Sequence, residues 1–327
     1  MANILLYKVC EYSEEYKKVF RGVYEDFRSK SFSDYKFELE PLEYDDFINA
    51  VNEGLIKCLI LLEDEVPTAF MVYTTEISEA LELNLIHCLG GEELNFKRKL
   101  LMERYLELNK DMLKEKVTTY PMLGSQSAFV EEITNYGFKL VGLAVVRFMF
   151  ANQSSVDIFK SYTPKPLPHG YTIGPWKDIY FNKSVNIIND AFKHTSDALF
   201  DTRFLSKEGC KDIIDKLVTG IYGTFLPDCT SVLLYKNEPV GICFANITGG
   251  KIGNIPLVGL VHKHRYKGFG ETLLHNTLKI ALENHADTLS ELNASTETDN
   301  YPAIRMYRRL GFKEDYCYPQ AYRPIEK

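Results

Sequence analysis

The chain has 327 residues, of which 45% are hydrophobic and 25% are charged, and its formal net charge at pH 7 is −7. This mixture is usual for a globular protein, and the acidic balance argues against a general binder of nucleic acid or anionic membranes. No apolar run is long enough to cross a bilayer, the start "MANILLYKVC" lacks a signal-peptide pattern, and the seven cysteines are scattered, so we expect a cytoplasmic protein with reduced thiols and no metal.

The elements predicted along the chain recur in the same order in two halves. In the first half, a helix at 14–29 precedes a hairpin at 54–75, an apolar strand at 80–89 and an amphipathic helix at 100–113. In the second half, a hairpin at 229–248 precedes a strand at 252–261 and a helix at 271–285. The halves also end alike, on "ITNYGFK" and "YRRLGFK". The repeat predicts an α/β (α+β) chain built from two units with mixed sheets.

The boundary between the halves is predicted from a proline-rich stretch. The segment "SYTPKPLPHGYT" at 161–172 holds three of the thirteen prolines, which is typical of a linker. We therefore expect a first domain at 1–152, a linker at 153–170 and a second domain at 171–327.

A basic, glycine-containing turn, "RYKGFG", lies between the strand and the helix of the second half. Unpaired N–H groups at a helix start, the helix dipole and glycines that admit a close ligand together make an anion site. The turn is not a P-loop, and Leu273 stands where a dinucleotide fingerprint needs its third glycine. A kinase glycine loop would precede a strand rather than a helix. A plain strand-to-helix turn is the alternative interpretation.

The strand before this turn, "NIPLVGLV", contains Pro256 and Gly259. Proline cannot donate to a sheet ladder and glycine weakens one, so the pair predicts a bulge or a strand that separates from its neighbour. Separation would expose backbone groups to which a linear, amide-bearing ligand could pair like an added strand.

The downstream stretch "TDNYPAIRMYRRLGFKED" predicts a short capped helix. Asp299 or Asn300 is suited to its N-cap, Pro302 to its first turn and Gly311 to its end. One face of this helix carries, at helical spacing, Ala303, Met306, Tyr307 and Leu310. The hydroxyl of Tyr307 is therefore predicted to face inward, toward a ligand in the opened sheet.

In these two motifs the second half resembles the GNAT superfamily of acyl-CoA N-acyltransferases. The family's phosphate turn, R/Q-x-x-G-x-G/A, is matched by Arg265, Gly268 and Gly270. Its later motif, N-x-x-A-x-x-x-Y-x-x-x-G-F, is matched by Asn300, Ala303, Tyr307, Gly311 and Phe312. The match covers roughly 170–318, and the whole layout is similar to tandem GNAT proteins. The resemblance implies two GNAT-like domains, each a mixed, mostly antiparallel sheet flanked by helices.

The resemblance also implies a coenzyme A site. The pantetheine arm would pair with the backbone of Leu260, Val261 and His262. The pyrophosphate would lie on the backbone of the turn, and Asn300 completes the predicted cofactor-binding set. The residues of the turn are Arg265, Tyr266, Lys267, Gly268, Phe269 and Gly270, with charge from the arginine and the lysine.

The reaction implied is direct transfer of an acetyl group from acetyl-CoA to a primary amine on a small molecule or peptide, with Tyr307 protonating the leaving thiolate. The general base stays open: Asn254 occupies the place of the family's usual glutamate and cannot act as a base, which leaves Glu297, Glu291 and His262.

Two other functions are considered. One is a non-catalytic acyl-CoA-binding sensor or partner-binding module. The other is a tandem acyltransferase that uses aminoacyl-tRNA, which the intact turn and the lack of a basic surface signal oppose. Neither the acceptor nor the oligomeric state is defined by the sequence.

The first half departs from the family pattern. Aligning the two long helices places Glu92, Asn95 and Lys97 at the positions of the arginine and two glycines of the turn. Ile133 and Gln126 take the places of the motif tyrosine and asparagine. The carboxylate of Glu92 would repel a phosphate, and the side chains of Asn95 and Lys97 would occupy the space that the two glycines leave open. We therefore expect a degenerate domain that has lost cofactor binding and is structural or walls one side of the substrate cleft.

Overall fold

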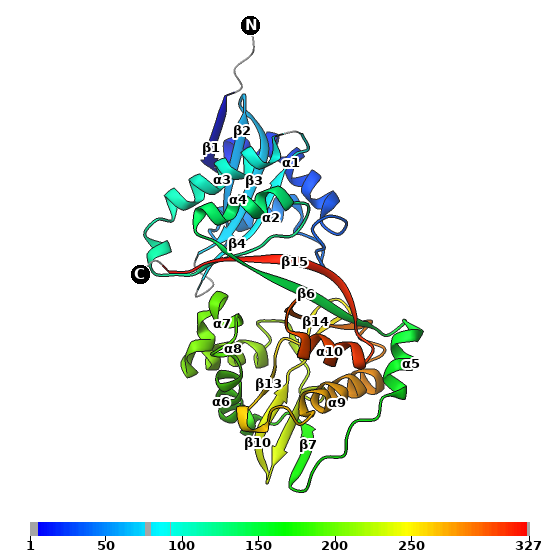
Figure 1. Cartoon of the computed structure of the whole chain (residues 1–327). Helices are drawn as coiled ribbons and strands as arrows, with labels where there is room; N and C mark the ends of the chain where they lie inside the picture. Colours follow the sequence, from blue (N-terminus) through cyan, green and yellow to red (C-terminus); the bar gives the residue numbers. More distant parts are fainter. Residues whose placement is uncertain (1–5, 76–79, 92, 326–327) are drawn as a thin grey trace. The chain divides into compact units, whose positions relative to one another are not determined.

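The computed structural model describes residues 6–75, 80–91 and 93–325 and divides the chain into two compact units. The first comprises Met1–Val141 with Tyr318–Lys327, and the second comprises Gly142–Cys317. The chain leaves the first unit within strand β6 (Lys139–Met149) and returns to it within β15 (Lys313–Arg323), as Figure 1 shows.

This division differs from the expected domains, because residues 142–170 belong to the second unit and the last ten residues belong to the first. The physical reason is pairing and packing. Residues 143–149 of β6 pair with β14, and helix α5 (Gln153–Ser161) buries Phe159 in the core of the second unit. Leu167, in the proline-rich stretch, packs against the same core.

The first unit is one sheet with helices. Strands lie in the order β1, β2, β3, β4, β5 and residues 318–323 of β15, and among the pairings of the described residues the β4–β5 pair is parallel and the others are antiparallel. The strands are β1 (Tyr7–Glu11), β2 (Lys57–Glu63), β3 (Val66–Thr74), β4 (Leu81–Cys88) and β5 (Thr118–Pro121). The helices are α1 (Lys17–Lys30), α2 (Tyr44–Asn52), α3 (Leu94–Leu108) and α4 (Ser127–Glu132), with short 3₁₀ turns at Glu14–Tyr16, Met112–Lys114 and Ile133–Tyr136.

The second unit holds two sheets. One has the order β6, β14, β12, β11, β8, and the other has the order β13, β10, β9, β7. The strands are β7 (Tyr171–Pro175), β8 (Thr224–Phe225), β9 (Ser231–Tyr235), β10 (Glu238–Cys243), β11 (Asn246–Gly249), β12 (Ile252–Asn254), β13 (Val258–Leu260) and β14 (Glu291–Glu297). The helices are α6 (Phe181–Phe192), α7 (Asp197–Phe200), α8 (Lys207–Val218), α9 (Phe269–Asn284) and α10 (Tyr301–Arg309), with 3₁₀ turns at Asp178–Tyr180, Thr202–Leu205 and His262–His264.

The predicted hairpins are confirmed in both units, and their turns have the same geometry. Asp64 and Glu65 have φ of 47° and 66°, and Lys236 and Asn237 have φ of 51° and 67°. Positive φ at both central residues is the type I′ turn, whose twist matches that of antiparallel strands. The sequence repeat is therefore a repeat of structure.

Alternating side chains of the β9–β10 hairpin supply two cores in the second unit. Leu233 and Cys243 pack with α9, whereas Val232 and Ile242 pack with α6 and α8. Figure 1 shows these helices on either side of β10 and β13. Among the described helices, none combines the length and apolar character that crossing a bilayer requires.

The predicted strand at 252–261 is divided at Pro256, as its proline and glycine indicated. The part before the proline, β12, pairs in parallel with β14, and Ile255 still donates to the carbonyl of Asn293. The part after it, β13, pairs with β10 in the other sheet. The two sheets therefore separate at this proline, and residues 294–297 of β14 lie beyond its pairing with β12.

Candidate functional site

A cavity of about 600 Å³ lies in the second unit where the two sheets separate. Part of its lining comes from β13 and from the starts of α9 and α10, including Leu260, Gly270 and Tyr307. The rest comes from the segment 191–204 and from the end of β14, including Asp197 and Glu297. The division of the strand at Pro256 thus opens a cavity that is lined by residues of the predicted motifs on one side and by residues of 191–204 and β14 on the other.

The turn before α9 presents a run of unused backbone donors. Gly268 is the N-cap of α9 and has φ of 84°, a left-handed conformation that glycine adopts without strain. Within the described part of the chain, the N–H groups of residues 266–271 have no hydrogen-bond acceptor. These groups lie at the positive end of the helix dipole, so the turn has the chemistry of an anion site.

The backbone of β13 offers a second set of donors. Val261 donates its N–H to the carbonyl of Val240, and Phe244 donates to the carbonyl of Leu257, so residues 257, 259 and 261 face β10. Because neighbouring residues of a strand direct their backbone groups to opposite edges, the N–H groups of Val258 and Leu260 point away from β10. Both residues line the cavity.

Two of the predicted cofactor residues are already engaged. The backbone N–H of His262 donates to Asp190 Oδ2 at 2.7 Å. The guanidinium of Arg265 donates to the carbonyl of Leu260 at 3.0 Å and to that of Ala191 at 3.0 Å. The arginine therefore ties the end of β13 to the end of α6 instead of presenting a free charge. Lys267, in the same turn, is exposed and has no acidic partner among the described residues.

Tyr307 lies on the inward face of α10, as the helical spacing predicted. Only 4% of the residue is exposed, and it lines the cavity. Its ring packs edge-on against Phe312, with the ring centroids 5.2 Å apart. Its hydroxyl has no hydrogen-bond partner among the described residues. Burial raises the pKa of Tyr307 well above its usual range, so the phenol keeps its proton at neutral pH.

Asn300 forms the N-cap of the same helix. Its side-chain oxygen accepts from the N–H of Ala303 at 3.3 Å, and the residue lines the cavity. The predicted cap is thus present, and it sets the direction of the helix that carries Tyr307.

Two carboxylates border the cavity without a basic partner in the described residues. Glu297 accepts a hydrogen bond from the Ser196 hydroxyl, and Asp197 accepts one from the Thr195 hydroxyl at 2.9 Å. Desolvation, followed by the nearby Asp197 and Asp299 charges, raises the pKa of Glu297. Desolvation likewise raises the pKa of Asp197. This part of the cavity therefore favours a cation or a proton.

The other candidate bases are placed less favourably. Glu291 is 5% exposed and forms an ion pair with Arg147. Asn254 donates to the side chain of Asn246 at 3.2 Å. Neither Glu291 nor Asn254 lines the cavity. The side chain of His262 is exposed and also lies outside the lining. Of the alternatives left open by the sequence, the cavity contains Glu297.

The corresponding region of the first unit is filled by its own side chains. Lys97 is buried and its Nζ lies 2.8 Å from Glu63, and Asn95 accepts from Arg98 at 3.3 Å. Ile133 is fully buried in the core. Gln126 is buried and accepts from the Tyr120 hydroxyl at 2.7 Å, whereas Glu92 lies outside the described residues.

Sequence comparison assigns this fold and these motifs to a family. Residues 203–312 match the acetyltransferase (GNAT) family. The second unit contains a GNAT domain. The match includes β13, the turn, α9 and the whole of α10. No curated protein matches the chain in sequence.

Solved structures of GNAT proteins, one of them described as a tandem GNAT protein, share this fold. A GCN5-related N-acetyltransferase from Sphaerobacter thermophilus is 14% identical, with a TM-score of 0.66 over 98% of this chain and 96% of that chain. A tandem GNAT protein from the clavulanic acid biosynthesis pathway is 10% identical, with a TM-score of 0.60 over 98% and 99%. The glucosamine N-acetyltransferase region of a fungal multi-domain GH3 β-N-acetylglucosaminidase is 12% identical, with a TM-score of 0.62 over 98% of this chain and 38% of that chain.

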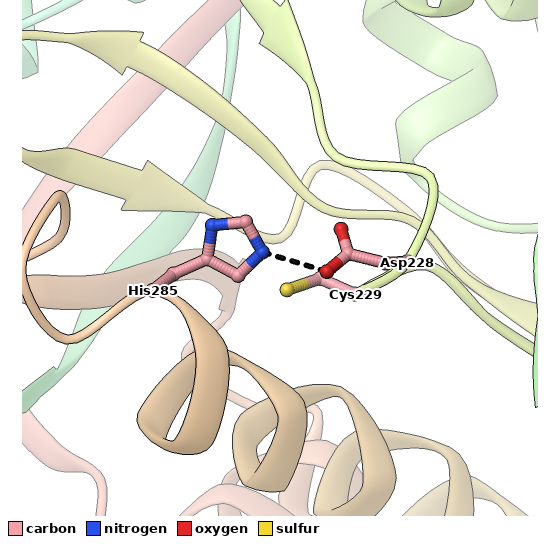
Figure 2. A group of neighbouring side chains, drawn as sticks. All are labelled: Asp228, Cys229 and His285. Atoms are coloured by element: carbon pink, nitrogen blue, oxygen red, sulfur yellow. Dashed lines mark hydrogen bonds and ion pairs between the residues drawn. The ribbon is translucent and has the colours of Figure 1, made fainter.

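The GNAT domain also holds a group of metal-ligand side chains away from the cavity. Figure 2 shows Asp228, Cys229 and His285, whose ligand atoms lie within 4.8 Å of one another. His285 Nε2 lies 2.8 Å from Asp228 Oδ2, and burial raises the pKa of the Cys229 thiol to about 12. The contact between His285 and Asp228 joins the end of α9 to the loop before β9.

The cavity brings together part of the predicted set, namely Leu260, Arg265, Gly270, Asn300 and Tyr307. The other predicted residues lie outside its lining, with Phe269 buried in the core and Tyr266 exposed. Sequence reasoning missed the lining contributed by residues 191–204, because short irregular elements there carry no motif.

Proposed function

We propose that the GNAT domain is an N-acetyltransferase that moves an acetyl group directly from acetyl-CoA to a primary amine. The observation that carries the proposal is one cavity whose lining includes free backbone donors, a buried tyrosine whose hydroxyl has no partner among the described residues, and a glutamate without a basic partner among them. A phosphate turn, a proton donor and a proton acceptor are the three parts that such a reaction needs.

The residues fit the donor. Residues 266–271 would hold the pyrophosphate through their N–H groups, with Lys267 adding charge. Val258 and Leu260 would pair with an amide-bearing arm as an added strand does. Arg265 would act by fixing β13 against α6. Acetyl-CoA supplies, when bound, an acyl group activated as a thioester.

Two side chains would carry out the proton transfers of the reaction. The Tyr307 hydroxyl keeps its proton at neutral pH and has no acceptor in the described part of the chain, so it would be free to donate to a departing thiolate. Glu297 would remove the proton from the amine, because its raised pKa makes it a stronger base than an exposed glutamate. The N–H of Leu260 would polarise the acyl carbonyl.

The first unit would not bind the donor. Its equivalent residues are engaged in internal contacts, with Lys97 paired to Glu63 and Ile133 buried where the hydroxyl would be needed. A structural role for this unit follows.

The proposal is tested by acetyl-CoA consumption across a panel of primary amines, preceded by a thermal-shift measurement with coenzyme A. We expect coenzyme A to raise the melting temperature and at least one amine to be acetylated. Stabilisation by coenzyme A without turnover of any amine would contradict catalysis and favour a non-catalytic acyl-CoA-binding protein.

A further inference from the structure

The cavity lining from residues 191–204 and β14 has a composition that the proposed reaction alone does not require. It combines two carboxylates with three aromatic rings, and we call this group the acidic wall: Asp197, Glu297, Phe192, Phe200 and Phe204. The rings of Phe192 and Phe204 are stacked with centroids 4.8 Å apart.

The carboxylates of the acidic wall are not neutralised by the protein. A third acid in the lining, Asp201, is neutralised, because Arg203 binds both of its oxygens at 2.9 and 2.7 Å. Neither Asp197 nor Glu297 has a basic partner among the described residues, and the charges of Asp197 and Asp299 both raise the pKa of Glu297. Leaving two close carboxylates partly buried without a cation is unfavourable, so a cationic ligand would relieve it.

A second, independent observation shows that this cavity is built to receive a ligand. Tyr307 lines the same cavity, and only 4% of its surface is exposed. Its hydroxyl has no hydrogen-bond partner among the described residues. A tyrosine hydroxyl that opens into a cavity without a protein partner is available to a bound ligand or water.

We propose that the acceptor is an aliphatic diamine or polyamine, with Glu297 at the reacting amine, Asp197 at a second protonated amine and the phenylalanine rings around the apolar chain. This inference rests on the proposed function and names its substrate class. A single reacting amine would need one of the two carboxylates, whereas a second cation accounts for the other. Aromatic faces also attract ammonium groups.

The test compares three probes of similar length: 1,4-diaminobutane, n-butylamine and 4-aminobutanoate. The acetyl transfer rate, as kcat/KM, should be at least about tenfold higher for the diamine than for the monoamine, and lowest for the amino acid, whose carboxylate is repelled. Asp197→Asn should reduce the ratio of the diamine rate to the n-butylamine rate about tenfold or more, whatever it does to each rate separately.

The matched control is Asp287→Asn, which removes the same charge from an exposed residue outside the cavity lining. This variant should keep the diamine preference. Equal rates for diamine and monoamine, or an unchanged preference in Asp197→Asn, would overturn the inference even if acetylation is observed.

Calorimetric titration of 1,4-diaminobutane into the full chain separates this inference from the proposed function. Binding that weakens about tenfold or more in Asp197→Asn supports the acidic wall even if no amine is turned over. Absence of both binding and turnover of the diamine contradicts it.

Discussion

Replacing Tyr307 with phenylalanine should lower kcat by about 10²–10⁴, the usual effect of losing one general acid. The ring and its contact with Phe312 remain, so the core keeps its packing. The hydroxyl has no partner among the described residues, so its removal should leave stability nearly unchanged. KM for acetyl-CoA should change little, because the proton matters only as the C–S bond breaks. Steady-state kinetics with an amine from the panel measures both constants.

The matched control is Tyr235→Phe, which removes a hydroxyl outside the cavity lining of the same unit. It should keep kcat within about twofold, because the ring and its packing remain and the half-buried Tyr235 lies outside the cavity. An unchanged kcat in Tyr307→Phe would show that this tyrosine is a packing residue and that the thiolate is protonated by solvent.

Replacing Gly270 with aspartate should weaken coenzyme A binding by about 1.5–3 kcal/mol or more, the value of each charge-assisted hydrogen bond lost. A Cβ at this position would meet Met306 Sδ at 3.2 Å, so the new carboxylate would enter the cavity lining. A carboxylate near a helix start favours the helix, so the melting temperature of the free protein should not fall for electrostatic reasons. Calorimetry measures the affinity and thermal denaturation measures the stability.

Gly270→Asn is the matched control, because asparagine has nearly the shape of aspartate without its charge. Its affinity should fall less than that of the aspartate variant. Equal losses in both variants would assign the effect to bulk, and wild-type affinity in Gly270→Asp would remove the turn from the proposed site.

The local features of the second unit could be predicted from the sequence because neighbouring residues determine them. Proline at 256 breaks a strand wherever the strand lies, and the spacing from Asn300 to Gly311 specifies a capped helix with Tyr307 on one face. The hairpins follow from two-residue turns between apolar runs. These features include the residues of β13, α9 and α10 that line one side of the cavity.

The remaining features depend on contacts between distant residues. Arg265 matches the motif, yet its guanidinium donates to the carbonyls of Asp190 and Ala191, which lie 75 and 74 residues earlier in the chain. No local sequence pattern indicates this contact. Asp197 and Glu297 come together from a short helix and a strand end that are 100 positions apart. The unit boundary was displaced for a similar reason, because β6 pairs with β14 well beyond the expected linker.

We expect the chain to bind acyl-CoA at the turn before α9 and at no equivalent place in the first unit. Calorimetric titration of coenzyme A into the full chain tests it most directly. We predict one site per chain, weakened in Gly270→Asp and retained in Lys97→Ala, which alters the equivalent helix of the first unit. Two equal sites per chain, or no binding at all, would contradict the account.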